Sequence, residues 1–581
     1  SIRYAKRWRI EPSDSAAYRR GELVRPVKQL VFYIDSLMPV KWNPYIKAGA
    51  ESWNKAFEKI GFKDVICVKE FPKNDTLFNA NSFDCMTIRY SASWLNSAQT
   101  TIHSDTRTGE ILNASILINA NMISVQYADR IGATVAIDPR VRTTVFPQEI
   151  QGELIQAAIA QAVGTGLGLT MNWGASCAYP VDSLRSASFT QKYGLASSVM
   201  GGVIINDVAT EEDVRNGVCL VNTKPGPYDE LVIKYLYQPI YASSLQEEKE
   251  TLDSWIREHT GDPYYAYIRN QSRFDSDPRN SRGSLGDDHL KSFDYMLPNV
   301  RKGFENYYSW FAKEDRDFLM RRRVHSALSE RLSGRIYAIL SYIGGIYLND
   351  IREKDAIPSY SMVDREKQKA ALSKALELAK NLDWVDDTAH LNEFEISDKK
   401  ADRLRLDIFN GIFGRLPYVE VCTERFPDAA YTASEYLDDI YGIVWEGVLK
   451  HRPLENFDRA LQTAFLESII STSTATAPIG SFKASKTGFA ATGKPEINLA
   501  ALRNGGKVDM KMYSLQNAEE VAGFSSIPPI YTNQTKIAAY YFDLLMRTKD
   551  MLKKAISTAP EADRSHYDLL IYRINKATEI E

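Results

Sequence analysis

The chain has 581 residues, of which 44% are hydrophobic and 25% are charged, which is the composition of an ordinary globular protein. A formal net charge of -3 and a pI of about 6.3 exclude the globally basic surface that is typical of nucleic-acid-binding proteins. The longest largely apolar run, residues 157–171, is too short to cross a bilayer and contains three glycines. We therefore predict no transmembrane segment.

The first 250 or so residues alternate strand-like and helix-like patterns. Short apolar runs predict strands over residues 29–34, 64–69, 86–90 and 110–119. Apolar residues at helical spacing predict helices over residues 43–60 and 147–163. In the last of the strands, the apolar positions are Ile111, Ile116 and Ile118, which follow a turn at Thr108-Gly109.

From about residue 250 the pattern changes to long helices with few strands. Helices are predicted over residues 287–311, 315–347, 364–382, 401–413, 434–450, 456–470, 535–554 and 560–577. Residues 471–506 are rich in Ser, Thr, Ala, Gly and Lys, which predicts a long loop or an insertion. We therefore predict an α+β fold, with one domain over residues 1–250 and a mainly helical region over residues 251–581.

Most common chemical signatures are missing from this sequence. The five cysteines form no C-x-x-C pair, so they are either free buried thiols or, in an oxidising compartment, include one disulfide pair. The seven histidines include no pair at i, i+4, and no G-x-S-x-G elbow occurs. Asp287-Asp288-His289 could supply metal ligands, but its position at a predicted helix start favours helix capping by Asp.

One segment has the spacing of the long zincin motif H-E-x-x-H-x-x-G-x-x-H. In that motif two His one helical turn apart and a third beyond a glycine bend bind zinc, while the Glu is the general base. In this register the chain has Gln161, Thr165 and Met171 at the three His positions and Ala162 at the Glu position. Gly168 occupies the position of the bend glycine. The frame of the motif is therefore retained while its ligands and its base are replaced.

A longer stretch of sequence fixes this register. Residues 163–186 resemble a bacterial family of large, envelope-associated, metzincin-like zinc-dependent metalloproteases, in which the helix reads H-E-V-G-H-T-L-G-L-x-H-N and leads into Y-P-V-D-S-L-R-S. Ser197-Ser198-Val199-Met200 fits the methionine turn that underlies the metal in metzincins. Further similar segments lie at residues 6–9, 26–27, 31–35, 42–47, 107–111, 226–229 and 285–288. The resemblance covers roughly the first half of the chain.

The departures from the family concern the zinc chemistry. A zinc site needs three or four ligands drawn from thiolate, imidazole and carboxylate, whereas Gln and Thr are weak neutral donors and Met is a soft thioether. Without the metal and the Glu there is neither a Lewis acid nor a base. After Met200 the family continues with Asp-Tyr, but this chain has Gly201-Gly202. We therefore identify the chain as a degenerate member, a pseudoprotease with no zinc cofactor.

Two interpretations of the replaced positions stay open. Gln161 and Thr165 fall on one helix face, where a hydrogen-bonded neutral pair could fill the space left by zinc. Alternatively, both are polar residues tolerated at a solvated helix end.

The resemblance also implies a metzincin-like domain built from a mixed sheet and helices. In metzincins an edge strand lines the cleft and pairs with an extended substrate, so residues 110–119, with Ile111, Ile116 and Ile118, form a candidate peptide-binding edge. An ordinary strand is the alternative.

The family implies a location in the bacterial cell envelope, at the outer membrane or cell surface as in a lipoprotein, with a polypeptide or envelope protein as partner and no nucleic acid. Since family members carry sequence before the segment with which this chain begins, we expect a piece of a longer precursor.

Three functions are compatible with these observations. We expect a catalytically inactive homologue that binds a polypeptide or partner through the retained cleft. The alternative is a structural accessory subunit of an outer-membrane complex that docks through the helical region. The third is a hydrolase with a relocated active site, which would use hydroxyls of the cleft and a free Cys177.

Overall fold

The computed structural model describes most of the chain. The described residues are 4–72, 74–75, 77–93, 95, 98–268, 276–280, 284–351, 353, 355–390, 399–473 and 534–578. The chain divides into two compact units, Ser1–Asn270 with Asp277–Leu404, and Gln271–Ser276 with Arg405–Glu581. The domain boundary near residue 250 stays a prediction. Apart from residues 471–473, the loop predicted over 471–506 lies outside the described residues.

The first unit contains a five-stranded mixed sheet. Its strands are β1 (Leu30–Ile34), β2 (Ile66–Glu70), β3 (Met86–Ser91), β4 (Ala98–Ser104) and β5 (Ile111–Asn119). The strand order is β2-β1-β3-β5-β4, in which every neighbouring pair is parallel except β4 with β5. The predicted α+β fold is therefore confirmed.

The strand that we predicted as the peptide-binding edge is an inner strand. Ile116 of β5 pairs with Ile88 of β3 on one side and with Thr100 of β4 on the other. Ile111, Ile116 and Ile118 are at most 2% exposed, because they face the core of the unit. The prediction of an edge at residues 110–119 was therefore wrong, and the edge of the sheet on this side is β4.

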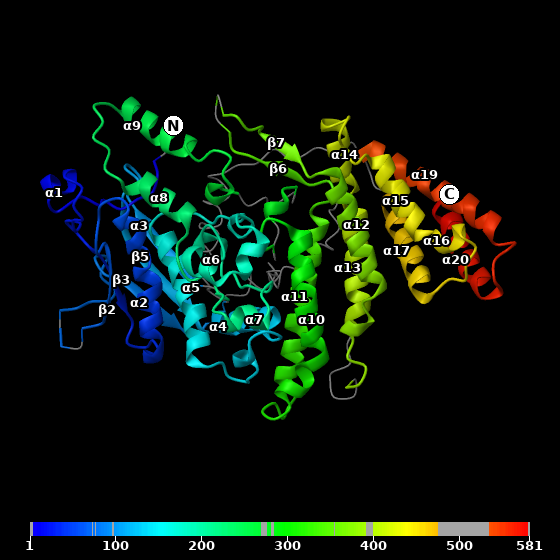
Figure 1. Ribbon diagram of the computed structural model, residues 1–581, viewed down its shortest axis with the longest axis horizontal. Helices are drawn as coiled ribbons and strands as arrows, with labels where there is room; N and C mark the ends of the chain where they lie inside the picture. The colour runs from blue at the N-terminus through cyan, green and yellow to red at the C-terminus, as the bar shows by residue number, and fades with distance from the viewer. Residues whose placement is uncertain are drawn as a thin grey trace, which may run out of the picture. The chain divides into compact units, whose positions relative to one another are not determined.

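Helices make up most of the rest of the first unit (Figure 1). They are α1 (Ser15–Arg19), α2 (Asn43–Glu51), α3 (Asn54–Glu58), α4 (Ala120–Thr134), α5 (Gln148–Gly166), α6 (Ala187–Tyr193), α7 (Glu211–Arg215), α8 (Pro227–Tyr237), α9 (Leu245–Arg257), α10 (His289–Phe311), α11 (Leu319–Leu340) and α12 (Arg365–Lys380). Short 3₁₀ turns are η1 (Val40–Trp42), η2 (Pro139–Val141), η3 (Ala175–Cys177), η4 (Val181–Arg185), η5 (Val199–Gly201), η6 (Pro263–Tyr265), η7 (Pro278–Asn280) and η8 (Asp383–Val385). A hairpin of β6 (Ile346–Leu348) and β7 (Tyr360–Met362) follows α11.

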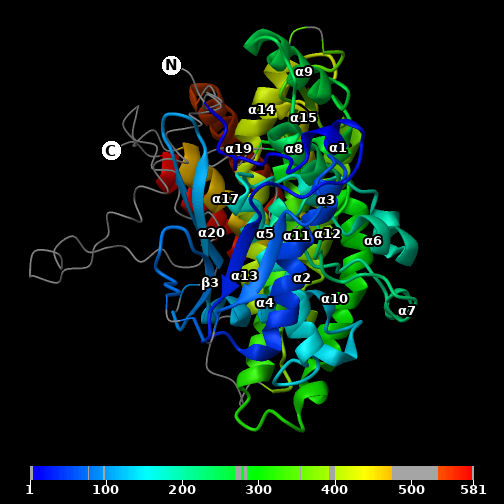
Figure 2. The same ribbon diagram turned by 90° about the vertical axis from the view of Figure 1, so that its left-hand side faces the viewer.

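The core of the first unit lies between the sheet and helices α2 and α5, which are seen beside the strands in Figure 2. Helix α5 is apolar around most of its circumference, which is typical of a buried helix. It passes so close to α2 that a Cβ on Gly49 would lie 2.5 Å from the backbone oxygen of Gln156. Side chains such as Phe32, Ile46 and Ile159 are at most 1% exposed, and burying each stabilises the fold by about 1.5–3 kcal/mol. This packing fixes α5, the helix that carries the motif, against the sheet.

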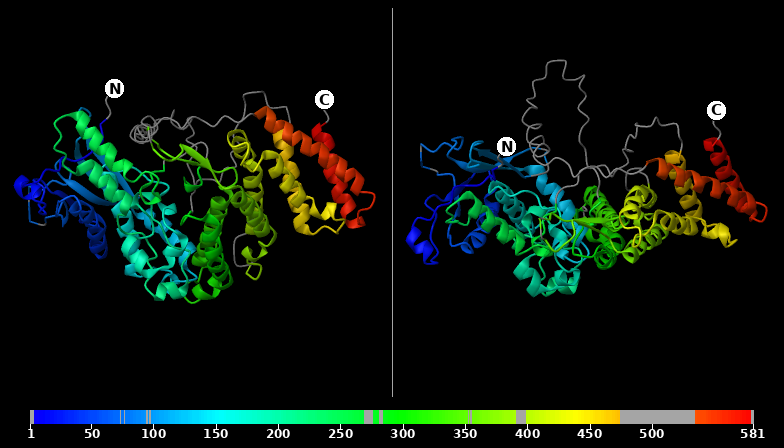
Figure 3. Two further views of the ribbon diagram at one scale, coloured as in Figure 1. Left: turned by 45° about the horizontal axis from the view of Figure 1, so that its top comes forward. Right: turned by 90° about the horizontal axis from the view of Figure 1, so that it is seen from above.

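The second unit is helical in its described part, and its helices run from yellow to red in Figure 3. They are α13 (Lys400–Gly414), which begins in the first unit, α14 (Leu416–Arg425), α15 (Ala433–Val444), α16 (Glu446–Leu449), α17 (Asn456–Ser473), α19 (Gln534–Ala555) and α20 (Glu561–Thr578). Trp445 and Phe465 pack edge to face, with ring centroids 6.0 Å apart, in its interior. Over the described residues, no helix of either unit has the length and apolar character required to cross a membrane.

Candidate functional site

Helix α5 ends in a glycine bend. The backbone N–H of Leu167 still donates to the carbonyl of Val163 at 2.8 Å. Gly168 then takes a φ of +91°, in the left-handed region. A Cβ at this position would lie 2.1 Å from the backbone oxygen of Lys6. The conformation and the contact therefore both require glycine at the bend.

The three positions at which the zincin motif has histidines come together beside this bend. Gln161 and Thr165 lie one turn apart on α5, and both are half-buried. The Gln161 Nε2 amide donates to the Sδ of Met171 at 3.1 Å. The Thr165 hydroxyl donates to the backbone carbonyl of Gln161 at 3.4 Å. The side-chain pair formed here is thus Gln161 with Met171, and not Gln161 with Thr165.

These side chains do not fit a zinc ion. An amide, a hydroxyl and a thioether stand in place of three imidazoles, and the amide and the hydroxyl are already engaged within the protein. Ala162, at the position of the general base, carries only a methyl group, and the residue is 5% exposed. Among the residues that the structure describes, no group of three or more His, Cys, Asp or Glu side chains could hold a metal ion.

The methionine turn lies directly beneath α5. Met200, within η5, is fully buried, and its Sδ lies 2.5 Å from where a Cβ on Gly164 would be. Its backbone carbonyl accepts a hydrogen bond from the N–H of Asn172 at 3.1 Å. Met200 therefore touches the helix between the first two ligand positions and the chain just after the third.

A buried carboxyl group holds the methionine turn in place. Asp229, near the start of α8, is fully buried and accepts hydrogen bonds from the Ser198 hydroxyl at 2.5 Å and from the backbone N–H groups of Val199 and Gly226, each at 2.9 Å. Desolvation raises the pKa of Asp229 to about 7, although the three hydrogen bonds act in the opposite direction. The carboxyl therefore joins α8 to the turn at a site where water does not reach it.

The edge strand β4 runs alongside the end of α5, which carries positions 161 and 165. The Thr100 hydroxyl donates to the backbone carbonyl of Ala162 at 2.9 Å. A Cβ on Gly166 would lie 3.7 Å from Cγ2 of Thr100. Thr101 and His103, further along the strand, are exposed. Sequence analysis missed this strand and therefore placed the edge one strand too far into the sheet.

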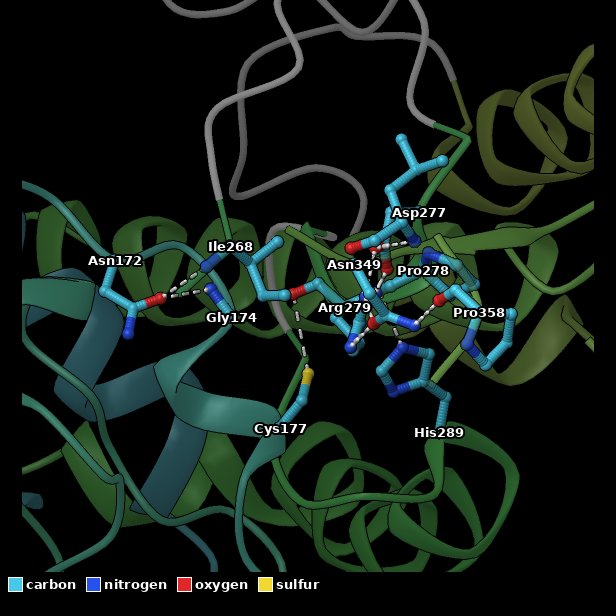
Figure 4. Close-up of polar contacts among 11 residues, drawn as sticks. Asn172, Gly174, Cys177, Ile268, Asp277, Pro278, Arg279, His289, Asn349 and Pro358 are labelled. Carbon is cyan, nitrogen blue, oxygen red and sulfur yellow. Dashed lines mark hydrogen bonds and ion pairs between the residues drawn. The ribbon is translucent and has the colours of Figure 1, made fainter. Parts of the chain in front are cut away.

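Two tyrosines lie next to the third ligand position. The rings of Tyr228 and Tyr267 stack with centroids 6.1 Å apart, and the Tyr267 hydroxyl is 3.2 Å from that of Thr170. Asn172 fixes residues 266–268 beside them, because its Nδ2 donates to the Ala266 carbonyl. Its Oδ1 accepts from the Ile268 N–H (Figure 4). The Tyr228-Asp229 pair belongs to a segment that carries the family resemblance, but nothing in the sequence placed Tyr267 here.

The groups needed for relocated nucleophilic chemistry are engaged elsewhere (Figure 4). The Cys177 thiol donates to the Arg279 carbonyl at 3.6 Å, and burial raises its pKa. His289 Nε2 lies 3.0 Å from the Pro278 carbonyl, and burial lowers the pKa of this imidazole to about 4. All five cysteines are free thiols, of which Cys85, Cys177 and Cys422 are buried. A buried neutral thiol is a poor nucleophile, so Cys177 gives the hydrolase hypothesis no support.

The segment at residues 287–289 has the capping role that we favoured. Asp288 is the N-cap of α10, and its carboxylate accepts hydrogen bonds from the backbone N–H groups of Leu290 and Lys291. His289 is the first residue of the helix.

Comparison with protein-family models matches residues 143–452, more than half of the chain, to the family DUF4953, described as Met-zincin. The chain belongs to the Met-zincin family. The matched region of this Met-zincin contains the end of α5, the bend at Gly168, the methionine turn and Asp229. No curated protein and no solved structure matches the chain.

Proposed function

We propose that this Met-zincin is a pseudoprotease that binds an extended polypeptide along β4, next to the emptied zinc motif. The observation that carries the proposal is the hydrogen bond from the Gln161 amide to the Met171 thioether. Two positions that would face a zinc ion in an active relative are here bonded to each other. This contact supports a packed neutral surface in place of a metal centre.

The missing chemistry extends beyond the metal ligands. Peptide hydrolysis at a zinc site needs a Lewis acid and a base that activates water. Ala162 can supply no base, and Gly201-Gly202 supply no side chain that could polarise a substrate carbonyl. No step of hydrolysis can be assigned to the side chains at these positions.

Polypeptide binding needs none of these groups. An extended segment can add to an exposed sheet edge through backbone hydrogen bonds alone. Strand β4 has one neighbour in the sheet, β5, and carries short polar side chains at Thr100 and Thr101. Because Thr100 also contacts α5 through Ala162, a segment added to β4 would pass the ligand positions. We place this activity in the bacterial cell envelope, at the outer membrane or cell surface, with a polypeptide or envelope protein as the partner.

A comparison of the two edges of the sheet tests this proposal. Thr101→Pro in β4 and Lys69→Pro in β2 each place a proline at an exposed position of an edge strand and remove one backbone hydrogen bond to the neighbouring strand, so the two variants disturb the sheet to a similar extent. Binding of an unstructured peptide library to the full chain is measured for both variants, and circular dichroism and thermal melting establish that each is folded. We expect Thr101→Pro to abolish most of the binding and Lys69→Pro to leave it unchanged.

A second variant keeps the test decisive if a proline disturbs folding. Thr165→Arg adds a long side chain at a half-buried position next to β4 without altering a strand. We expect it to weaken peptide binding. Equal binding by Thr165→Arg, Thr101→Pro and the unmodified chain would reject the cleft as the binding site and favour docking through the helical region.

A further inference from the structure

The second unit contains a groove that is separate from the zincin motif. It has a volume of about 490 Å³ and lies between α15 and α16 on one side and α19 on the other, which are labelled in Figure 1. The groove is lined by Tyr441, Val448, Leu449, His451, Arg547, Asp550, Met551, Lys554 and Ala555. Its volume is within the range of small-molecule sites, which is roughly 300–1,000 Å³.

The groove combines an apolar floor with a cationic rim. Tyr441 and Val448 are each 3% exposed, and Met551 lies beside the Tyr441 hydroxyl at 3.3 Å. The Arg547 guanidinium lies over the Tyr441 ring at 4.0 Å, and one of its two terminal nitrogens donates to Asp438. Lys554 follows two turns later on α19 and lines the same groove.

The charges at the rim are only partly neutralised. Arg547 pairs with the exposed Asp438 at 2.6 Å. Among the described residues, no carboxylate lies within salt-bridge distance of the Lys554 ammonium group, and Asp550 is the single acid in the lining. A ligand with an anionic head would gain the attraction of Lys554 and of Arg547, while its apolar part covered the floor.

The backbone conformation of His451 brings its side chain to the groove. His451 has a φ of +51° just after α16, where the Arg452 N–H donates to the Gly447 carbonyl at 3.0 Å. Glycine is the residue that this helix-ending position favours, since a side chain there costs conformational energy. The His451 side chain is one of those that line the groove.

We infer that this groove binds a small amphipathic anion, with an apolar body on Val448 and Met551 and a carboxylate, sulfonate or phosphate head between Lys554, Arg547 and His451. The site does not depend on the zincin motif or on β4. Its ligand class follows from the pairing of an apolar floor with a cationic rim.

Titration of the full chain with the fluorescent probe 8-anilinonaphthalene-1-sulfonate tests this inference. We expect saturable binding that decanoate displaces and that decylamine, which has the same apolar body and the opposite charge, does not. Lys554→Gln should weaken binding by about three- to five-fold, whereas Lys553→Gln, one residue away on α19 and outside the lining, should leave it unchanged.

His451→Gly separates a ligand-binding role from a structural one. Because glycine adopts a positive φ without strain, the variant should melt at the same temperature as the unmodified chain or higher, while it binds the probe more weakly. Displacement by decylamine, equal affinity in the Lys554→Gln and Lys553→Gln variants, or a lower melting temperature for His451→Gly would each overturn the inference.

Discussion

Two groups of residues around the end of α5 differ in how they are held. Gly168, Met200 and Asp229 are fixed by close backbone approaches, full burial and three hydrogen bonds to one carboxyl. Gln161 and Met171 are half-buried and share a single contact between an amide and a sulfur atom. The supporting frame is therefore determined by packing, whereas the ligand positions are tolerant of change.

This difference explains how a zinc motif can lose its ligands and keep its shape. In the frame, a substitution leaves a clash or a buried group without partners, which are the mechanisms that destabilise proteins most. At the ligand positions, neutral side chains replace histidines without leaving a buried charge. The comparison leads to four predictions, which run from the largest expected effect to the smallest.

Restoring the histidines should restore zinc binding. In the triple variant Gln161→His, Thr165→His and Met171→His, the retained bend and methionine turn should place three imidazoles around one point. We expect stoichiometric zinc after desalting, measured by mass spectrometry. Met171→His alone is the control and should retain none. A triple variant that folds but fails to bind zinc would show that the frame has changed with the ligands.

Gly168→Ala should destabilise the first unit by about 3 kcal/mol or more, because the added Cβ would lie 2.1 Å from the Lys6 oxygen in a left-handed conformation. Gly21→Ala is the matched control, since Gly21 also has a positive φ but no atom within 4 Å of an added Cβ. Urea denaturation measures both. Equal losses of unfolding free energy in the two variants would mean that the close approach to Lys6 does not add to the effect of Gly168→Ala on stability.

Asp229 should make stability depend on pH. Its pKa is raised from 3.8 to about 7 in the folded chain, so the folded state holds the proton more tightly than the unfolded state. The contribution of the Asp229 carboxyl to the free energy of unfolding is fully present below about pH 4 and is lost as the pH rises to about 7. The change in this free energy is on the order of a few kcal/mol.

Asp229→Asn should remove this pH dependence. The difference in unfolding free energy between the two chains, measured by denaturation across this pH range, isolates the contribution of the carboxyl. A difference that stays constant from pH 4 to pH 7 would contradict the raised pKa.

Gln161→Ala should have the smallest effect, a loss of at most about 1 kcal/mol, because it removes one hydrogen bond from a half-buried group. Thermal melting measures the loss. If Gln161→Ala lost as much stability as Gly168→Ala, Gln161 would belong to the supporting frame, and the two groups of residues would not differ in how they are held.

Much of the fold around the site could be predicted from the sequence. The buried strands β1 and β3 and the helix α5 are apolar runs, so their pattern is visible without tertiary context. Strand β4 was missed because Ile102 is its one large aliphatic residue, and the strand exists through its pairing with β5. An edge depends on which strands lie beside it, and no local pattern contains that information.

Tertiary contacts also explain the helix boundaries that differ. The helix predicted over residues 43–60 is broken between α2 and α3, where Trp53 enters the core and the Asn54 side chain bonds to both backbone groups of Ile66. The helix predicted over 315–347 ends at Leu340, and the chain continues into the strand β6. The first break accompanies contacts with the distant Ile66, and the second precedes Gly344, which has a φ of +62° and donates its N–H to the Gln368 side chain at 2.8 Å.

The sequence predicted which positions of the candidate site lie close together, but not the contacts that their side chains make. The motif spacing brings positions 161, 165 and 171 together because the helix and the glycine bend fix their distances. The spacing could not show that the Gln161 amide would turn toward Met171, since the choice depends on side-chain rotamers and on the surrounding packing.

The zinc content of the purified chain tests the central claim most directly. The chain is incubated with excess zinc, desalted exhaustively and analysed by mass spectrometry. Our account predicts no retained metal, because an amide, a hydroxyl and a thioether replace the three imidazoles. One zinc ion per chain would contradict it and would mean that other side chains of this Met-zincin form a metal centre.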